Sequence, residues 1–119
     1  MTRRSTRFLA RFWREGLVAG AVFATVLTGS LAMAKSFHDV SQKGRAFNMK
    51  TLAVEKGDTV RFNNDDEFIH QIFIESKAFN FDSAESNPGD VIPVEFTTAG
   101  VYEVHCHIHP KMLLTVTVN

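Results

Sequence analysis

Apolar and polar residues alternate in short runs along this chain, and that pattern sets the strongest limit on its fold. The clearest runs lie at residues 52–54, 60–62, 92–96, 101–106 and 114–118. Because successive side chains of a strand point to opposite faces, a period of two predicts half-buried strands. No helical period of comparable length competes with these runs after residue 34. Short strands about ten residues apart are typical of an all-β sandwich or barrel.

Three other segments are less regular. Residues 68–75 form a dense apolar run, which we predict as a strand that carries His70 and two isoleucines on one face. The alternation breaks down between residues 76 and 90, where Asn87-Pro88-Gly89-Asp90 predicts a turn. Residues 35–49 carry a weaker pattern, although their apolar side chains could belong to first strands.

The first 34 residues have the composition of an export signal. Five arginines and a single acidic residue precede an uncharged run over residues 16–34, which ends in Ala32-Met33-Ala34. A basic start, an apolar centre and a small-residue cleavage site predict a secretory signal peptide, 1–34, and a mature domain, 35–119. We expect a periplasmic protein with no stable membrane association after cleavage. An uncleaved anchor is the alternative, because a run of this length nearly spans a bilayer.

The charge and cysteine content of the predicted mature domain narrow its function. From Lys35 onward there are twelve acidic and eight basic residues with no basic patch, which argues against nucleic acid as a partner. The one cysteine, Cys106, cannot form a disulfide within the chain and is therefore a stray thiol or a ligand. A domain this small buries a modest core, so a bound metal would add useful stability.

The cysteine lies in a short stretch rich in potential metal ligands. Residues 105–112 contain Cys106, three of the five histidines of the chain, and Met112. A thiolate, two imidazoles and a weak axial thioether form the trigonal site of blue copper proteins. The spacing C-x2-H-x2-M lets one loop present Cys106, His109 and Met112 to one ion, and His70 would come from a neighbouring strand. We therefore predict one copper ion that cycles between Cu(I) and Cu(II).

Each candidate ligand also has a purely structural interpretation. A lone histidine on an apolar strand, like His70, is more often a hydrogen-bonded core residue, and Met112 could be core filler. The nearby cysteine loop favours ligation for both residues. His105 and His107 alternate away from Cys106, so they are expected to face outward. Two further features are expected at the surface: His38 and the acidic run Asp65-Asp66-Glu67.

The chain resembles the cupredoxins, and within them the amicyanin, pseudoazurin and plastocyanin group. The matching stretches are residues 57–63, His70, residues 98–106 and residues 109–112. This resemblance implies a Greek-key β-sandwich that holds one type 1 copper ion at His70, Cys106, His109 and Met112. The chain differs from the usual family pattern at Gln71, where Asn is usual, and at Ile108, where Pro is frequent. The backbone N–H of Ile108 is thereby available to approach the thiolate.

The resemblance implies one-electron transfer between redox proteins by a monomer that docks transiently near His109 and Pro110. A copper-handling protein, which stores or delivers the ion, is the alternative, because His38 and the histidines beside Cys106 could receive copper in transit. A third hypothesis is the electron-transfer subunit of an oxidoreductase. The His-Cys-His motif is similar to one in the multicopper oxidases. Their second copper cluster, however, needs further His-x-His pairs on other segments, which this chain lacks. We therefore expect no enzymatic activity of its own.

Overall fold

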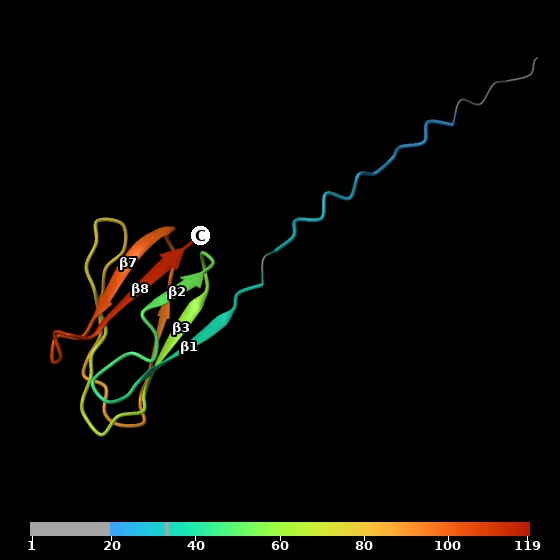
Figure 1. The fold of residues 1–119 in the computed structure, drawn as a ribbon. Coiled ribbons are helices and arrows are strands. Elements are labelled where there is room, and N and C mark those ends of the chain that lie inside the picture. Colours follow the sequence, from blue (N-terminus) through green and yellow to red (C-terminus); the bar gives the residue numbers. More distant parts are fainter. Residues whose placement is uncertain (1–19, 33) are drawn as a thin grey trace, which may run out of the picture. The chain divides into compact units, whose positions relative to one another are not determined.

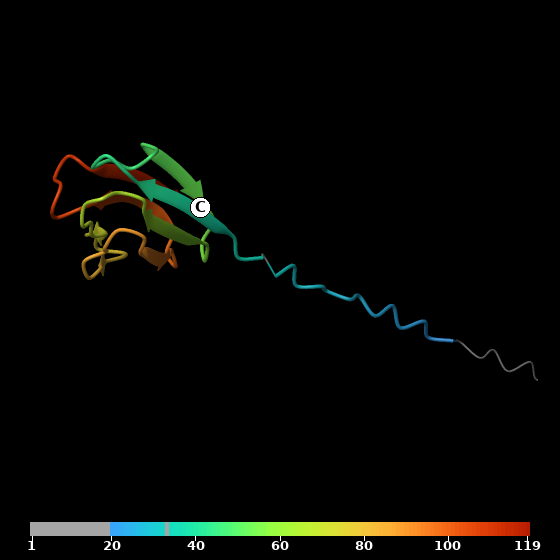
Figure 2. The same cartoon turned by 90° about the horizontal axis from the view of Figure 1, so that it is seen from below.

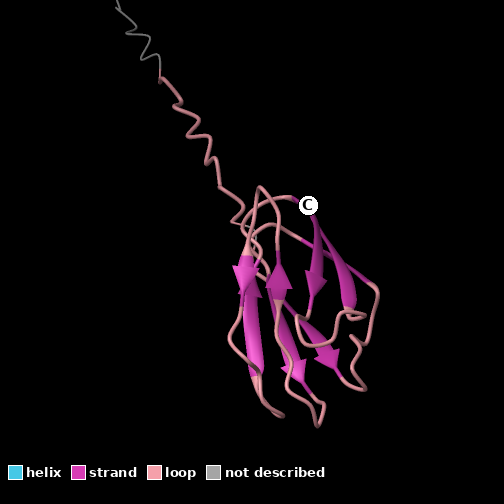
Figure 3. Ribbon diagram, turned by 90° about the vertical axis from the view of Figure 1, so that its left-hand side faces the viewer, coloured by secondary structure: helices cyan, strands magenta, loops and turns pink. Residues whose placement is uncertain are grey.

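The computed structural model describes residues 20–32 and 34–119, and in these ranges the chain contains strands and loops but no helix (Figure 3). Residues Ala32–Asn119 form one compact unit. The basic start of the predicted signal peptide and Met33 of its expected cleavage site lie outside the described residues. No helix in the described ranges is long and apolar enough to cross a membrane.

Eight strands within the described residues build two sheets, as the alternating sequence pattern predicts. Their bounds are β1 (Phe37–Gln42), β2 (Thr51–Val54), β3 (Thr59–Asn64), β4 (Phe73–Ile74), β5 (Phe81–Asp82), β6 (Val91–Glu95), β7 (Gly100–His105) and β8 (Leu113–Val118). One sheet has the order β1-β3-β6 and the other the order β2-β8-β7-β4-β5. The predicted all-β sandwich is therefore confirmed (Figure 1).

Two parallel pairings connect segments that are distant in the chain. β1 pairs with β3, and β2 pairs with β8, whereas β7 runs antiparallel to β8. β8 therefore lies inside the five-stranded sheet, between β2 and β7. The loop that joins β7 to β8 projects at the opposite end of the sandwich from Asn119 (Figures 1 and 2). That loop carries the predicted copper ligands Cys106, His109 and Met112.

The inward faces of both sheets form a single hydrophobic core. Burial of each large apolar side chain contributes about 1.5–3 kcal/mol relative to leaving it exposed. The rings of Phe79, Phe96 and Tyr102 pack against one another, at centroid distances of 5.3, 5.5 and 6.1 Å. The side chains at the centre of the core are Val40, Val60, Phe62, Ile72, Val94, Phe96, Val104, Leu114 and Val116.

The structure corrects two strand predictions near the site. The expected strand over 68–75 is reduced to β4, and the backbone of His70 pairs with Ser86 in an isolated bridge outside the strands. The ladder is interrupted because the backbone N–H of Ile72 donates to the side-chain hydroxyl of Ser83. The second correction concerns residues 76–90, which contain β5 although no alternating pattern predicted a strand there. Residues 68–72 are thus a loop that presents His70.

A buried carboxylate fixes the start of β3. Asp58 is 4% exposed and accepts hydrogen bonds from the backbone N–H groups of Ser36 and Glu55, each at 3.0 Å. His38 Nε2 lies 2.9 Å from the same carboxylate, so the expectation of a freely exposed His38 was wrong: its side chain is 28% exposed. The bond to His38, followed by those from Ser36 and Glu55, lowers the pKa of Asp58 to about 2.

These contacts predict how Asp58 contributes to acid stability. Because its pKa is below the ordinary value of 3.8, the ionised carboxylate stabilises the folded state at every pH above about 4. We expect that contribution to disappear as the pH falls from about 4 to about 2. Urea unfolding of the copper-free protein should therefore show Asp58→Asn less stable than wild type at neutral pH, with the difference shrinking over that window. A difference independent of pH would contradict this assignment.

Candidate metal centre

His70 reaches the site from the loop between β3 and β4. Its side chain is fully buried, and its backbone exchanges two hydrogen bonds with Ser86, at 3.0 and 2.8 Å. Asn64, the last residue of β3, donates from its side-chain amide to the carbonyl oxygens of Phe68 and Ser86. The loop is therefore hydrogen-bonded to the end of β3 and to the segment around Ser86, which fixes the position of the imidazole before any metal binds.

The other candidate ligands come from the β7–β8 loop. Cys106 follows the last residue of β7 and is 2% exposed, and Met112 directly precedes β8 and is 1% exposed. The backbone N–H of Met112 donates to the carbonyl oxygen of His109 at 2.9 Å, which closes the loop into a tight turn. His109 is half-buried. The short spacing seen in the sequence thus becomes a compact loop with its ends anchored in two paired strands.

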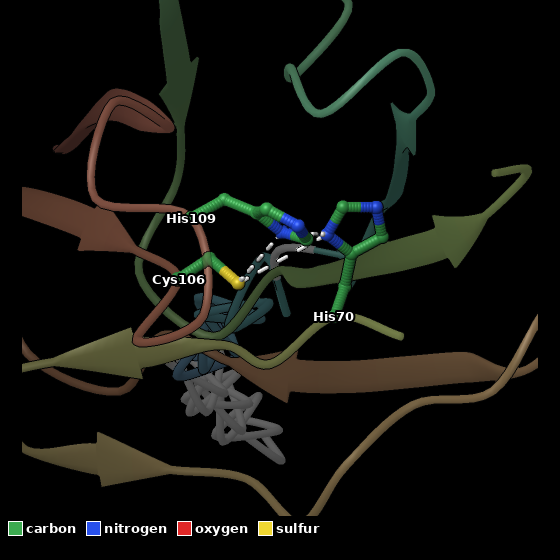
Figure 4. A group of neighbouring side chains, drawn as sticks. All are labelled: His70, Cys106 and His109. Atoms are coloured by element: carbon green, nitrogen blue, oxygen red, sulfur yellow. Dashed lines mark hydrogen bonds between the residues drawn. The ribbon is translucent and has the colours of Figure 1, made fainter. Parts of the chain in front are cut away.

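Three ligand atoms converge, as Figure 4 shows. The sulfur of Cys106 lies 3.9 Å from Nδ1 of His70 and 3.9 Å from Nδ1 of His109, and the two nitrogens are 3.2 Å apart. The centre of this triangle is about 2.1 Å from each atom, close to the usual length of metal–imidazole and metal–thiolate bonds. The donor set and its spacing therefore fit a transition-metal ion without rearrangement of the loops.

The surroundings of His109 favour the neutral imidazole that a metal requires. Burial is the main cause that lowers the pKa of His109; the neighbouring His70 and Arg45 lower it further, while Asp66 acts in the opposite direction. A neutral imidazole keeps one ring nitrogen unprotonated, with a lone pair that can bind a metal. The site is therefore prepared to bind a cation at neutral pH.

Asp66 is a functional candidate that the sequence interpretation missed. The run Asp65-Asp66-Glu67 was predicted as a solvated loop, but Asp66 is buried and lies 2.9 Å from Nε2 of His70. The backbone N–H of Arg45 donates to its carboxylate at 2.8 Å and is the main reason that the pKa of Asp66 falls to about 2. The signal available in the sequence is a carboxylate four residues before a candidate ligand, which by itself is weak.

The sulfur of Cys106 accepts a backbone hydrogen bond from the neighbouring loop. Gln71 N–H donates to it at 3.4 Å, so the residue after His70 contacts the thiolate through its main chain. This bond does not depend on the side chain at position 71. Hydrogen bonds to a ligating sulfur tune the redox potential of copper. The expected approach of the Ile108 N–H to the sulfur stays a prediction.

His105 and His107 face away from the triangle, as the strand alternation predicts. Their side chains are 37% and 46% exposed. Nε2 of His105 lies 3.3 Å from Glu103, and Nε2 of His107 lies 3.6 Å from Asp82. The ring of His107 also packs against that of Phe73, at a centroid distance of 4.0 Å. Among the described residues, the three-ligand group suited to a metal is the one at His70, Cys106 and His109.

The surface around His109 is a shallow hollow. It is lined by Ile108, Pro110 and Lys111 from the same loop and by Arg45 from the loop after β1. The guanidinium of Arg45 lies over the ring of Phe68, at 3.9 Å from its centroid. Ile108 is 42% exposed, so an apolar contact surface lies next to the half-buried imidazole.

Comparison with known proteins decides the family. Residues 34–119 match the family described as copper binding proteins, plastocyanin/azurin family. The chain belongs to this family. It is a cupredoxin, and copper is its cofactor, for which the triangle of His70, Cys106 and His109 with Met112 in the same loop fits one type 1 ion. No curated protein sequence matches the chain.

Solved structures agree with this assignment. A purple cupredoxin from Nitrosopumilus maritimus is 26% identical over 69% of this chain and 99% of its own, with a TM-score of 0.62. A reduced variant of amicyanin is 25% identical over 72% of this chain and 85% of its own, with a TM-score of 0.66. A copper-containing nitrite reductase from Thermus scotoductus is 27% identical over 69% of this chain, with a TM-score of 0.64, but the match spans 22% of the reductase.

Proposed function

We propose that this cupredoxin carries single electrons between redox partners in the periplasm. In this proposal His70, Cys106 and His109 are the equatorial ligands of one type 1 copper ion, and Met112 is the axial ligand. The observation that carries it is the triangle of one sulfur and two nitrogens, with sides of 3.9, 3.9 and 3.2 Å. A site of one thiolate and two imidazoles matches the trigonal blue-copper arrangement.

The bound copper supplies the one-electron couple, and the chain holds its ligands still. His70 is fully buried and bonded through its ring and its backbone, so its position changes little when the charge of the site changes. Met112 and Cys106 are likewise buried. A site that needs little rearrangement exchanges electrons with a low barrier, because no solvent or ligand must reorganise first.

In this proposal electrons pass between the copper and a partner through His109, since it alone of the three equatorial candidates is not fully buried. Its neighbours Ile108 and Pro110 are exposed and apolar, and they provide a small contact surface beside the ring. Transient redox complexes bury small interfaces, below about 1,200 Å² in total. A monomer with one such surface is the arrangement that we propose for this carrier.

Export of the carrier is also part of the proposal. Residues 1–34 would act as the signal peptide and residues 35–119 as the mature copper domain. The family match begins at residue 34 and the compact unit begins at Ala32, and both observations support this proposed division. N-terminal sequencing of the protein recovered from the periplasm would test the boundary, with Lys35 expected as the first residue.

A copper-handling role is the second candidate, and it is favoured by the half-exposed His105 and His107 beside the site. The copper stoichiometry separates the two functions. A carrier should bind one tightly held ion per chain, accept one electron per copper from a small reductant, and return to Cu(II) on reoxidation with the ion retained. Two or more ions, or rapid loss of Cu(I) to an acceptor chelator, would instead support storage or delivery.

A further inference from the structure

We propose that Asp66 is a positioning residue of the copper site, which selects the metal-binding tautomer of His70 and lowers the reduction potential by placing a buried negative charge behind that ligand. The inference rests on the proposed role of His70 as a ligand. It extends that role to a residue outside the set of four predicted ligands.

The contact between the two side chains defines the tautomer. Oδ2 of Asp66 lies 2.9 Å from Nε2 of His70, and the two side chains are 5% and 0% exposed. An ionised carboxylate can only accept a hydrogen bond, so Nε2 of His70 must carry the proton. Nδ1 then keeps its lone pair, and it is Nδ1 that faces the sulfur of Cys106 at 3.9 Å. Asp66 therefore leaves the correct nitrogen free for the metal.

Asp66 is itself held by the backbone on either side. The N–H groups of Arg45 and Glu67 donate to its carboxylate at 2.8 and 2.9 Å, and the Asn64 side chain accepts from the N–H of Asp66 at 3.0 Å. Arg45 lies in the left-handed region, with a φ of 56°, which is unfavourable for a residue with a side chain. The loop after β1 therefore adopts a costly backbone conformation at the residue whose N–H reaches Asp66.

Among the described residues, no arginine or lysine side chain pairs with the carboxylate of Asp66. That carboxylate contacts the imidazole of His70, whereas the guanidinium of Arg45 lies over the ring of Phe68. The carboxylate is thus stabilised by backbone dipoles, and its charge acts on the imidazole of His70. A carboxylate bonded to the outer nitrogen makes a histidine ligand more basic. Greater basicity favours Cu(II) over Cu(I), which lowers the reduction potential.

The chain contains a matched control for this residue. Asp58 also accepts two backbone N–H groups and the Nε2 of a histidine, which is His38 at 2.9 Å. The two aspartates flank opposite ends of β3, and six residues at about 3.3 Å each separate them by roughly 20 Å. Removal of either charge disturbs the same kind of network, but only Asp66 contacts a candidate ligand. An effect on copper that is specific to Asp66 is therefore distinguishable from general destabilisation.

The experiment measures the midpoint potential and Cu(II) affinity of Asp66→Asn, Asp66→Glu and Asp58→Asn, each produced from the full-length chain. Loss of an outer-shell partner typically costs about tenfold to a hundredfold in metal affinity. If that loss falls on Cu(II), the potential of Asp66→Asn should rise by about 59 mV for each factor of ten. Asp66→Glu, which keeps the charge, should restore part of this shift, and Asp58→Asn should leave the potential unchanged. Equal potentials in Asp66→Asn and wild type would overturn the inference.

A second measurement on the copper-free wild type covers the case in which Asp66→Asn does not fold. Nitrogen NMR at mildly alkaline pH should show the proton of His70 on Nε2, and a proton on Nδ1 would refute the proposed tautomer. The absence of a thiolate-to-copper band in loaded wild type would count against the proposed function itself. That outcome is independent of the tautomer, so the two failures can be told apart.

Discussion

Replacing Cys106 with alanine should abolish the intense thiolate-to-copper absorption of the loaded protein. The sulfur of Cys106 is the thiolate in the ligand triangle, at 3.9 Å from each imidazole nitrogen, and the chain has no other cysteine. Without it, copper would bind with no thiolate ligand, with a weak absorption and an ordinary Cu(II) spin-resonance spectrum. Absorption and spin-resonance spectra of Cu(II)-loaded Cys106→Ala, compared with wild type, measure this directly.

His107→Ala is the matched control for that experiment. His107 directly follows Cys106 in the sequence, but its side chain is 46% exposed and faces Asp82 and Phe73. We expect the band of His107→Ala to keep its position and nearly its full intensity. A band that persists without Cys106, or that disappears without His107, would show that the ligand assignment is wrong.

Phe62→Ala should produce a large loss of stability. Phe62 is fully buried in the middle of β3, where its ring meets that of Phe47 edge to face at a centroid distance of 5.9 Å. Truncation of a buried Phe to Ala costs about 3–5 kcal/mol, because it removes apolar contacts and leaves a cavity. Small domains are stable by only about 5–15 kcal/mol, so the copper-free variant should be close to unfolding.

Urea unfolding of the copper-free proteins tests this expectation, since bound copper would add its own stabilisation to the folded state. Phe37→Ala supplies the comparison, because Phe37 lies on β1 of the same sheet but is 65% exposed. Its free energy of unfolding should change by less than about 1 kcal/mol. Similar losses for Phe37→Ala and Phe62→Ala would place the core differently from the structure described here.

Much of the fold follows from local patterns. The alternation at 60–62, 92–96 and 114–118 corresponds to β3, β6 and β8, because each of these strands has one face that is more deeply buried than the other. The spacing of Cys106, His109 and Met112 likewise predicts a common loop, since three ligands in so few residues leave little choice of geometry. Such features are visible because the physical cause lies within one segment.

Other features depend on contacts between distant segments and were missed for that reason. β5 is held by two register pairs with β4, and neither segment alternates long enough to be recognised by itself. The burial of Asp66 depends on the loop of Arg45, which covers it from a different part of the chain. His38 on β1 likewise contacts Asp58, which directly precedes the adjacent strand β3. A polar residue looks solvated in sequence until its partner is known.

The place of β8 inside the sheet has a consequence for when the metal site can exist. All four candidate ligands precede β8 in the chain, yet the loop that carries three of them is anchored only when β8 pairs with β7 on one side and β2 on the other. A nascent or truncated chain that stops at residue 112 would contain all four candidate ligands but would lack β8, which anchors one end of their loop. Copper insertion should therefore follow synthesis of β8, which couples binding of the cofactor to assembly of the five-stranded sheet.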